Sequence, residues 1–274
     1  GGSIITAATL RGAVNAILIL FLTLLLMPVQ MLARHHGGPL GRRIPVYYHR
    51  ITARLIGLQI ETTGTPVHQR PVLYVANHTS WLDIVTLGAL LEAGFIAKSE
   101  VANWPGIGML ARLQGSVFVS RNEHRIRDEA IAIAARLKVG QSLVLFPEGT
   151  STDGRRVLGF HSGFFSVVEG WSGPKELLVQ PLSIAYVRQC GLPIRRADVN
   201  HFAWYGDMEF APHLWAILCR GGTFEAEIKF HAPIRAAYCA DRKVLAQLCK
   251  AMVNNSFCQV EKGGTLFNED QTEP

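Results

Sequence analysis

An uncharged segment, residues 12–33, constrains the fold of this chain more than any other feature. At about 1.5 Å per residue, a helix of this length crosses a hydrocarbon layer of roughly 30 Å. Its centre, residues 16–22, is apolar on every side rather than along one stripe. Three interpretations stay open: a spanning helix, a helix that enters one leaflet and bends at Pro28, and a core helix or signal sequence.

Positive charge is concentrated beside this segment. Residues 1–60 contain no Asp or Glu and carry six arginines, whereas the whole chain has 27 Lys and Arg against 21 Asp and Glu, so the remainder is neutral. Arginines that follow an apolar helix face the cytoplasm, which predicts a membrane protein on the cytoplasmic face of the inner membrane. The arginines are not interleaved with stacking aromatic residues, so no nucleic-acid partner is expected. These arginines are Arg11, Arg34, Arg42, Arg43, Arg50 and Arg54.

The cysteines argue against a disulfide framework. They number five, and none forms a Cys-x-x-Cys pair, which also argues against structural zinc. Free thiols suit a reducing compartment.

Two regions follow from these patterns. Residues 1–60 are predicted to form membrane-anchoring helices, with a second, interfacial helix over residues 44–60. The turn residues that begin at Gly64 then mark the start of a folded domain over residues 61–274.

The second region alternates short apolar runs with helical patterns, which predicts an α/β domain. Its central sheet is expected to be mixed and largely parallel, with helices on its faces and reacting groups where strands end. Strands are predicted at residues 71–76, 95–97, 116–120, 142–146, 177–186 and 224–230, and helices at residues 80–91 and 125–138.

His78 and Asp83 are the first candidates for chemistry. His78 follows the strand predicted at residues 71–76, and Asp83 lies within the next helical turn or so. Such a carboxylate can reach back to one imidazole nitrogen and make the other a better base. Taken alone, the pair also fits a capping aspartate beside a structural histidine.

Two further strand ends carry charged residues. Glu148 follows the strand predicted at residues 142–146, where it can bind hydroxyls, orient the loop or simply end the strand. Arg121 follows another strand and suits a phosphate, although a surface arginine is the simpler interpretation. A serine hydrolase is disfavoured, because the only near match to Gly-x-Ser-x-Gly has His161 at the serine position.

Taken together and in this order, these pieces resemble the glycerolipid acyltransferase family, which includes bacterial 1-acylglycerol-3-phosphate acyltransferases. The resemblance covers about residues 60–190, and residues 201–208 resemble a branch that includes lyso-ornithine-lipid acyltransferases. The four blocks are Asn77-His78-x₄-Asp83, Gly115-x₂-Phe118-x₂-Arg121, Phe146-Pro147-Glu148-Gly149-Thr150, and Pro181.

The resemblance implies that His78 is the general base and that Asp83 orients it. The donor would be acyl-CoA or acyl-carrier protein, and neither a metal nor another cofactor is expected. The acceptor would be a lysolipid hydroxyl, that of 1-acylglycerol-3-phosphate, with a lyso-ornithine lipid or a non-catalytic lipid-binding role as alternatives. Residues implied in substrate binding are Asn77, Lys98, Gly115, Phe118, Arg121, Glu148, Gly149, Thr150 and Pro181.

One position departs from the family pattern. Many lysophosphatidate enzymes carry a basic residue after the Glu-Gly-Thr block, whereas here Ser151 follows and the next cations are Arg155 and Arg156. Lys98 is a candidate to replace the lost phosphate contact. The departure leaves room for an acceptor without a phosphate.

Overall fold

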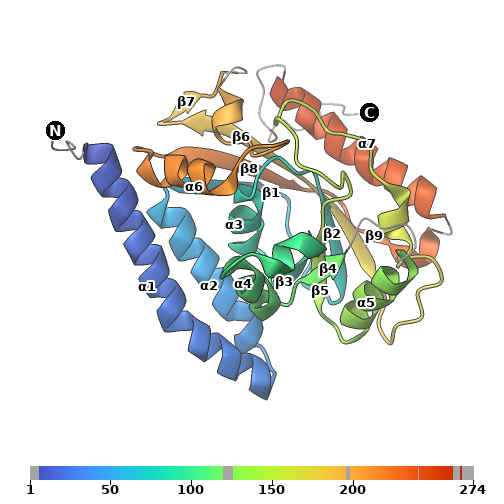
Figure 1. Ribbon diagram of the computed structural model, residues 1–274. Helices are drawn as coiled ribbons and strands as arrows, with labels where there is room; N and C mark the ends of the chain where they lie inside the picture. The colour runs from blue at the N-terminus through green and yellow to red at the C-terminus, as the bar shows by residue number, and fades with distance from the viewer. Residues whose placement is uncertain (1–5, 120–125, 196–197, 240, 262–265, 267–274) are drawn as a thin grey trace.

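The computed structural model describes residues 6–119, 126–195, 198–239, 241–261 and 266. Figure 1 shows the arrangement of its elements. The α-helices are α1 Ala7–His36, α2 Leu40–Leu55, α3 Leu82–Gly88, α4 Ile107–Gln114, α5 Ile126–Lys138, α6 Phe210–Cys219 and α7 Arg242–Glu261. The strands are β1 Leu58–Thr63, β2 Val72–Ala76, β3 Ala93–Lys98, β4 Val117–Val119, β5 Ser142–Leu145, β6 Leu178–Gln189, β7 Leu192–Pro193, β8 Phe224–Phe230 and β9 Ile234–Arg235.

One mixed, largely parallel sheet runs through the domain in the order β1-β8-β6-β2-β5-β3-β4. β2 is parallel to both β5 and β6, β3 is parallel to β4 and β5, and β1 is parallel to β8. β8 runs antiparallel to β6, and so do the short strands β7 and β9. The fold class predicted from the sequence is therefore confirmed.

Helices cover both faces of this sheet, which explains the continuous apolar runs of its central strands. α2, α3 and α6 contribute Ala53, Leu87 and Ile217 to the hydrophobic core on one face. α5 and α7 contribute Leu137 and Cys249 to the core on the other face. In Figure 1, α7 lies on the side of the sheet away from α1.

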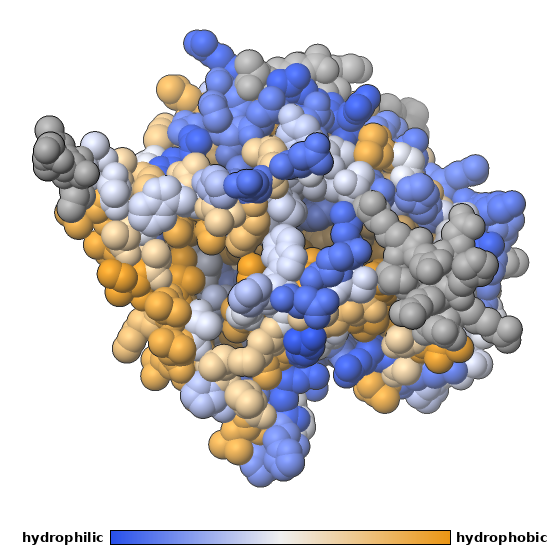
Figure 2. Space-filling view, viewed as in Figure 1, coloured by the Kyte–Doolittle hydropathy of each residue, from blue (hydrophilic) through white to orange (hydrophobic). Residues whose placement is uncertain are grey.

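The first helix, α1, is the one described helix that is long and apolar enough to cross a membrane. Pro28 lies inside it without ending it. Large apolar side chains along α1 face outward, among them Ile17 and Phe21, each 65% exposed. They form the hydrophobic band at the left edge of Figure 2. This exposure rules out a buried core helix, and the chain associates with membranes through α1.

The other side of α1 packs along the folded domain. Near its start, the Asn15 side chain donates to the carbonyl of Leu218, which lies in α6. Near its end, Gln30 donates to the carbonyl of Leu113, which lies in α4. α1 is thus held against the folded domain near both of its ends.

The second predicted helix ends earlier than expected. α2 stops at Leu55, and the chain enters β1 at Leu58 because Gly57 adopts a left-handed conformation with φ of 77°. The boundary predicted at residue 60 therefore falls inside β1, an edge strand that the sequence analysis missed. β1 was missed because Leu58 and Ile60 also fit the apolar spacing of the helix predicted over residues 44–60.

Candidate active site

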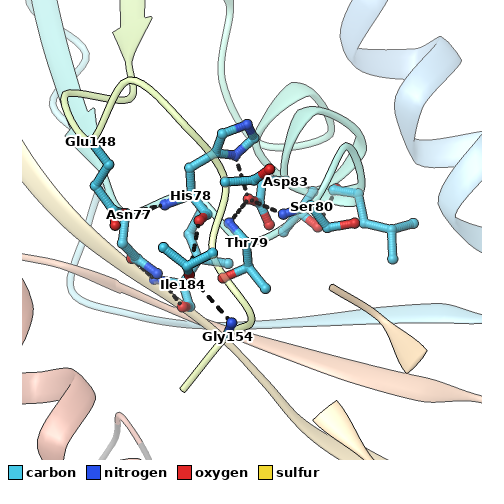
Figure 3. Close-up of polar contacts among 12 residues, drawn as sticks. Asn77, His78, Thr79, Ser80, Asp83, Glu148, Gly154 and Ile184 are labelled. Carbon is cyan, nitrogen blue, oxygen red and sulfur yellow. Dashed lines mark hydrogen bonds and ion pairs between the residues drawn. The ribbon is translucent and has the colours of Figure 1, made fainter. Parts of the chain in front are cut away.

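The candidate catalytic residues meet at the carboxyl edge of the parallel strands. His78 follows β2 and Glu148 follows β5, its parallel neighbour, so both loops emerge at the same edge. Figure 3 shows the Glu148 side chain reaching the backbone N–H of His78, while the His78 imidazole points away from Glu148 and meets Asp83. This is the place where α/β sheets usually carry their reacting groups.

His78 and Asp83 form a hydrogen-bonded pair. Nδ1 of His78 lies 2.8 Å from Oδ2 of Asp83. The same carboxylate oxygen accepts hydrogen bonds from the backbone N–H groups of Thr79 and Ser80, at 2.7 and 3.0 Å. Because the Asp83 side chain is fully buried, these donors replace the water that an ionised carboxylate needs.

A residue missed by the sequence analysis completes this arrangement. The hydroxyl of Tyr186, in β6, donates to Oδ1 of Asp83 at 2.8 Å. Burial raises the pKa of Tyr186 well above its ordinary value, and the charge of Asp83 raises it further, so the phenol stays a donor. A lone tyrosine in a buried apolar strand needs a polar partner, and this was the signal available in the sequence.

The imidazole is held in one orientation and stays partly exposed. The ring of Phe146 stacks on it with centroids 4.1 Å apart, and the His78 side chain is 19% exposed. Because Asp83 accepts from Nδ1, the proton of the neutral ring belongs on Nδ1. Nε2 is then the nitrogen that can accept a proton from a bound hydroxyl.

Glu148 holds the loop that carries His78. It is 3% exposed, and its carboxylate oxygens accept from the backbone N–H groups of His78 at 2.7 Å and Leu158 at 2.8 Å. Burial raises its pKa to about 7, against the opposing effect of these two hydrogen bonds. Both oxygens thus face backbone donors rather than the space beside the imidazole.

Asn77 has a similar positioning role. Its Nδ2 donates to the carbonyl of Ile184 at 2.9 Å, and its Oδ1 accepts from the N–H of Ile184 at 2.8 Å. The side chain is 2% exposed. It ties the end of β2 to β6 and fixes where His78 begins.

Four other predicted residues lie on or near the same edge. Gly149 and Thr150 follow Glu148, and Gly149 has a positive φ of 66°. Lys98 is exposed at the carboxyl end of β3. In the neighbouring β4, Phe118 is half-buried beneath the Arg112 guanidinium, 5.5 Å from its ring centroid.

The remaining predicted residues are placed elsewhere. Pro181 is buried within β6 opposite Val75, beneath the site rather than in it. Gly115 follows α4 at the amino end of β4, where its carbonyl accepts from Gln141, so the structure does not bring it to His78. Arg121 lies outside the described residues.

Comparisons with known proteins identify relatives of this chain. Residues 59–185 match the family model described as Acyltransferase. The chain is 43% identical to the lyso-ornithine lipid O-acyltransferase of Brucella abortus, over 82% of this chain and 86% of that protein. It is 37% identical to the enzyme of the same name from Rhizobium meliloti, over 87% and 82%.

Two further proteins share part of the likeness. The 1-acyl-sn-glycerol-3-phosphate acyltransferase of Neisseria meningitidis is 33% identical over 60% of each chain. The crystal structure of the 1-acyl-sn-glycerophosphate acyltransferase PlsC from Thermotoga maritima superposes with a TM-score of 0.64 at 18% identity, and covers 93% of this chain and 98% of that one. This last likeness concerns the fold alone.

Proposed function

The chain belongs to the acyltransferase family, and on this premise we propose that it moves a fatty acyl chain from a thioester donor to the hydroxyl of a lyso-ornithine lipid. It is an O-acyltransferase of membrane lipids. One observation carries the choice of acceptor. The likeness to lyso-ornithine lipid enzymes reaches 43% identity and covers most of the chain, whereas the likeness to the Neisseria enzyme stops at 33% and 60% coverage.

The pair formed by His78 and Asp83 provides the base for this reaction. Nε2 of His78 takes the proton of the acceptor hydroxyl while its oxygen attacks the thioester carbonyl. The carbon–sulfur bond breaks, and the imidazolium returns the proton to the departing thiolate. Asp83 stabilises the imidazolium through the 2.8 Å contact, so the products are an ester and a free thiol.

A 1-acylglycerol-3-phosphate acceptor is the second candidate. Arg155 and Arg156 lie in the loop that follows the Glu148 block, and Arg156 is exposed. The same loop is tied to the catalytic turn, since the N–H of Thr152 donates to the His78 carbonyl at 2.9 Å. These arginines are therefore placed to bind a phosphate if that acceptor is used.

The packing of α1 supports a position in one leaflet. Its hydrogen bonds to Leu218 and Leu113 lie near its two ends, so the helix is fastened along the domain instead of standing free of it. We propose that its exposed apolar side lies among acyl chains on the cytoplasmic face, with the end that carries Arg34 in contact with lipid head groups. Membrane-impermeant maleimide applied from the cytoplasmic side should label a His36→Cys variant beyond the level of the wild type, whose exposed Cys190 gives the background. Extra labelling from the other side instead contradicts this orientation.

Parallel acceptor assays test the proposed function. The purified protein in detergent receives palmitoyl-CoA, and thiol release is followed with lyso-ornithine lipid or lysophosphatidic acid. We expect kcat/KM to be at least about tenfold higher for lyso-ornithine lipid, a discrimination of about 1.4 kcal/mol. Release that depends on lysophosphatidic acid alone contradicts the proposal.

Two controls complete this assay. An Arg155→Gln/Arg156→Gln variant should change transfer to lyso-ornithine lipid by less than about twofold if these residues serve only a phosphate. Palmitoyl-carrier protein replaces palmitoyl-CoA if the CoA ester is inert. Absence of transfer from both donors to both acceptors supports a non-catalytic lipid-binding role.

A further inference from the structure

A polar cavity lies at the edge of the sheet opposite the active site. It has a volume of about 240 Å³ and is enclosed by α2, the segment before β2, and the amino ends of β2, β3 and β5. His78 follows the carboxyl end of β2, and five residues of strand separate the two edges by roughly 15 Å. The cavity is therefore separate from the catalytic residues.

Positive charge dominates the walls of this cavity. Arg43, Arg50 and Arg70 line it, together with a single acidic residue, Glu92. Glu92 already contacts two of these arginines, Arg70 at 2.5 Å and Arg43 at 3.5 Å, and also Arg42 at 3.5 Å. One carboxylate thus meets three guanidinium groups, while Arg50 donates from Nε to the carbonyl of Ala89 at 2.8 Å, and an excess positive charge remains for an anion to neutralise.

One of these guanidinium groups has an unused donor. Nη1 of Arg70 is buried and has no hydrogen-bond partner in the described part of the chain, while Nη2 of the same residue binds Glu92. A buried donor without a partner destabilises the folded state. Arg70 lines the cavity, so a small shift of its guanidinium would bring Nη1 to an anion oxygen, and a planar guanidinium suits a phosphate group.

The size and surroundings of the cavity point to a lipid head group. Its volume lies below the roughly 300–1,000 Å³ of pockets that hold drug-sized ligands, so it fits a phosphate with a few further atoms and not a nucleotide. Apolar and aromatic side chains share its wall, including Val46 and Tyr47 of α2, and Tyr47 is 54% exposed. α2 also packs against α1, since the hydroxyls of Tyr48 and Thr23 lie 3.0 Å apart.

From these observations we propose that the cavity between α2 and the amino ends of β2, β3 and β5 binds the phosphate of an anionic membrane lipid. The lipid is a bound partner rather than a reactant, because the paired His78 and Asp83 lie at the opposite edge of the sheet. Basic cavities beside membrane helices recognise lipid head groups in this manner. The bound head group would hold the arginine-rich α2 and the adjoining end of α1 at the membrane surface.

A matched pair of variants on α2 tests this proposal. Arg50 lines the cavity, whereas Arg54, one helical turn further on, is exposed and does not line it. Arg50→Gln and Arg54→Gln remove the same charge. Binding of dioctanoyl phosphatidylglycerol to the full-length protein in neutral detergent is measured by calorimetry. We expect Kd to rise about tenfold or more in Arg50→Gln and less than about twofold in Arg54→Gln; equal Kd values in both variants and the wild type overturn the proposal.

A third variant separates ligand binding from a purely structural ion pair. Glu92→Gln removes the carboxylate that competes with the lipid, so Kd should fall severalfold; an unchanged Kd in a variant whose circular dichroism matches the wild type counts against the site. If this variant does not fold, the Arg50 and Arg54 pair still decides. Inorganic phosphate that binds as tightly as the lipid, with the same dependence on Arg50, overturns the assignment to a lipid.

Discussion

Replacing Asp83 by Asn separates the charge of this residue from its shape. The asparagine oxygen can keep the position of Oδ2, where it accepts from Nδ1 of His78 and from two backbone N–H groups. The amide nitrogen then takes the position of Oδ1, and the hydroxyl of Tyr186 can turn to accept from it. The fold should therefore survive while the negative charge beside the imidazolium is lost.

The size of the effect follows from the geometry of this contact. With Nδ1 and Oδ2 2.8 Å apart, the centres of the two charges are separated by about 4 Å. At an effective dielectric constant of about 20, such charges attract by about 4 kcal/mol. Because about 1.36 kcal/mol changes a rate tenfold, Asp83→Asn should lower kcat/KM by about 10³-fold.

Thiol release from palmitoyl-CoA in the presence of lyso-ornithine lipid measures this loss. Tyr186→Phe is the matched control, since it removes one hydrogen bond to the same carboxylate and keeps the charge; we expect a loss of about tenfold or less. If Asp83→Asn retains more than about a tenth of the wild-type kcat/KM, the carboxylate does not stabilise an imidazolium and the reasoning fails.

Two further substitutions test the residues that position the site. Glu148 has its pKa raised to about 7 from an ordinary 4.5, so its neutral form favours folding; that contribution is complete below pH 4.5 and lost as the pH rises through 7. The free energy of unfolding of the wild type should thus fall relative to Glu148→Gln by up to roughly 3 kcal/mol across this window, which denaturant titrations at several pH values can measure. A difference that is constant with pH contradicts this account. Asn77→Ala leaves the N–H and carbonyl of Ile184 unpaired inside the protein and should lower the free energy of unfolding by about 2–4 kcal/mol, whereas a loss below about 0.5 kcal/mol shows that they find other partners.

The central strands and the catalytic pair could be predicted from local sequence. β2 and β5 are short apolar runs that end in polar residues, and parallel strands bring their carboxyl ends to one edge. His78 and Asp83 are five residues apart, so their contact depends on one turn of backbone. In the structure, β2 and β5 are parallel neighbours, and His78 contacts Asp83.

Contacts between segments far apart in the chain could not be predicted from local sequence. Tyr186 lies 103 residues from Asp83, and their hydrogen bond depends on the register of β6 against β2. The contact of Glu148 with the backbone of His78 likewise depends on the pairing of two parallel strands, β2 and β5. Gly115 shows the converse, since α4 returns the chain to the amino edge before β4 starts.

Removal of the imidazole tests the account most directly. Purified wild-type protein and His78→Ala are incubated with palmitoyl-CoA and lyso-ornithine lipid, and the acylated product is quantified by mass spectrometry. Loss of a general base costs roughly 10²–10⁴-fold in rate, so the variant should form product at that reduced level while its circular dichroism stays unchanged. Product formation by a folded His78→Ala at a rate near that of the wild type would contradict the assignment of His78 as the base.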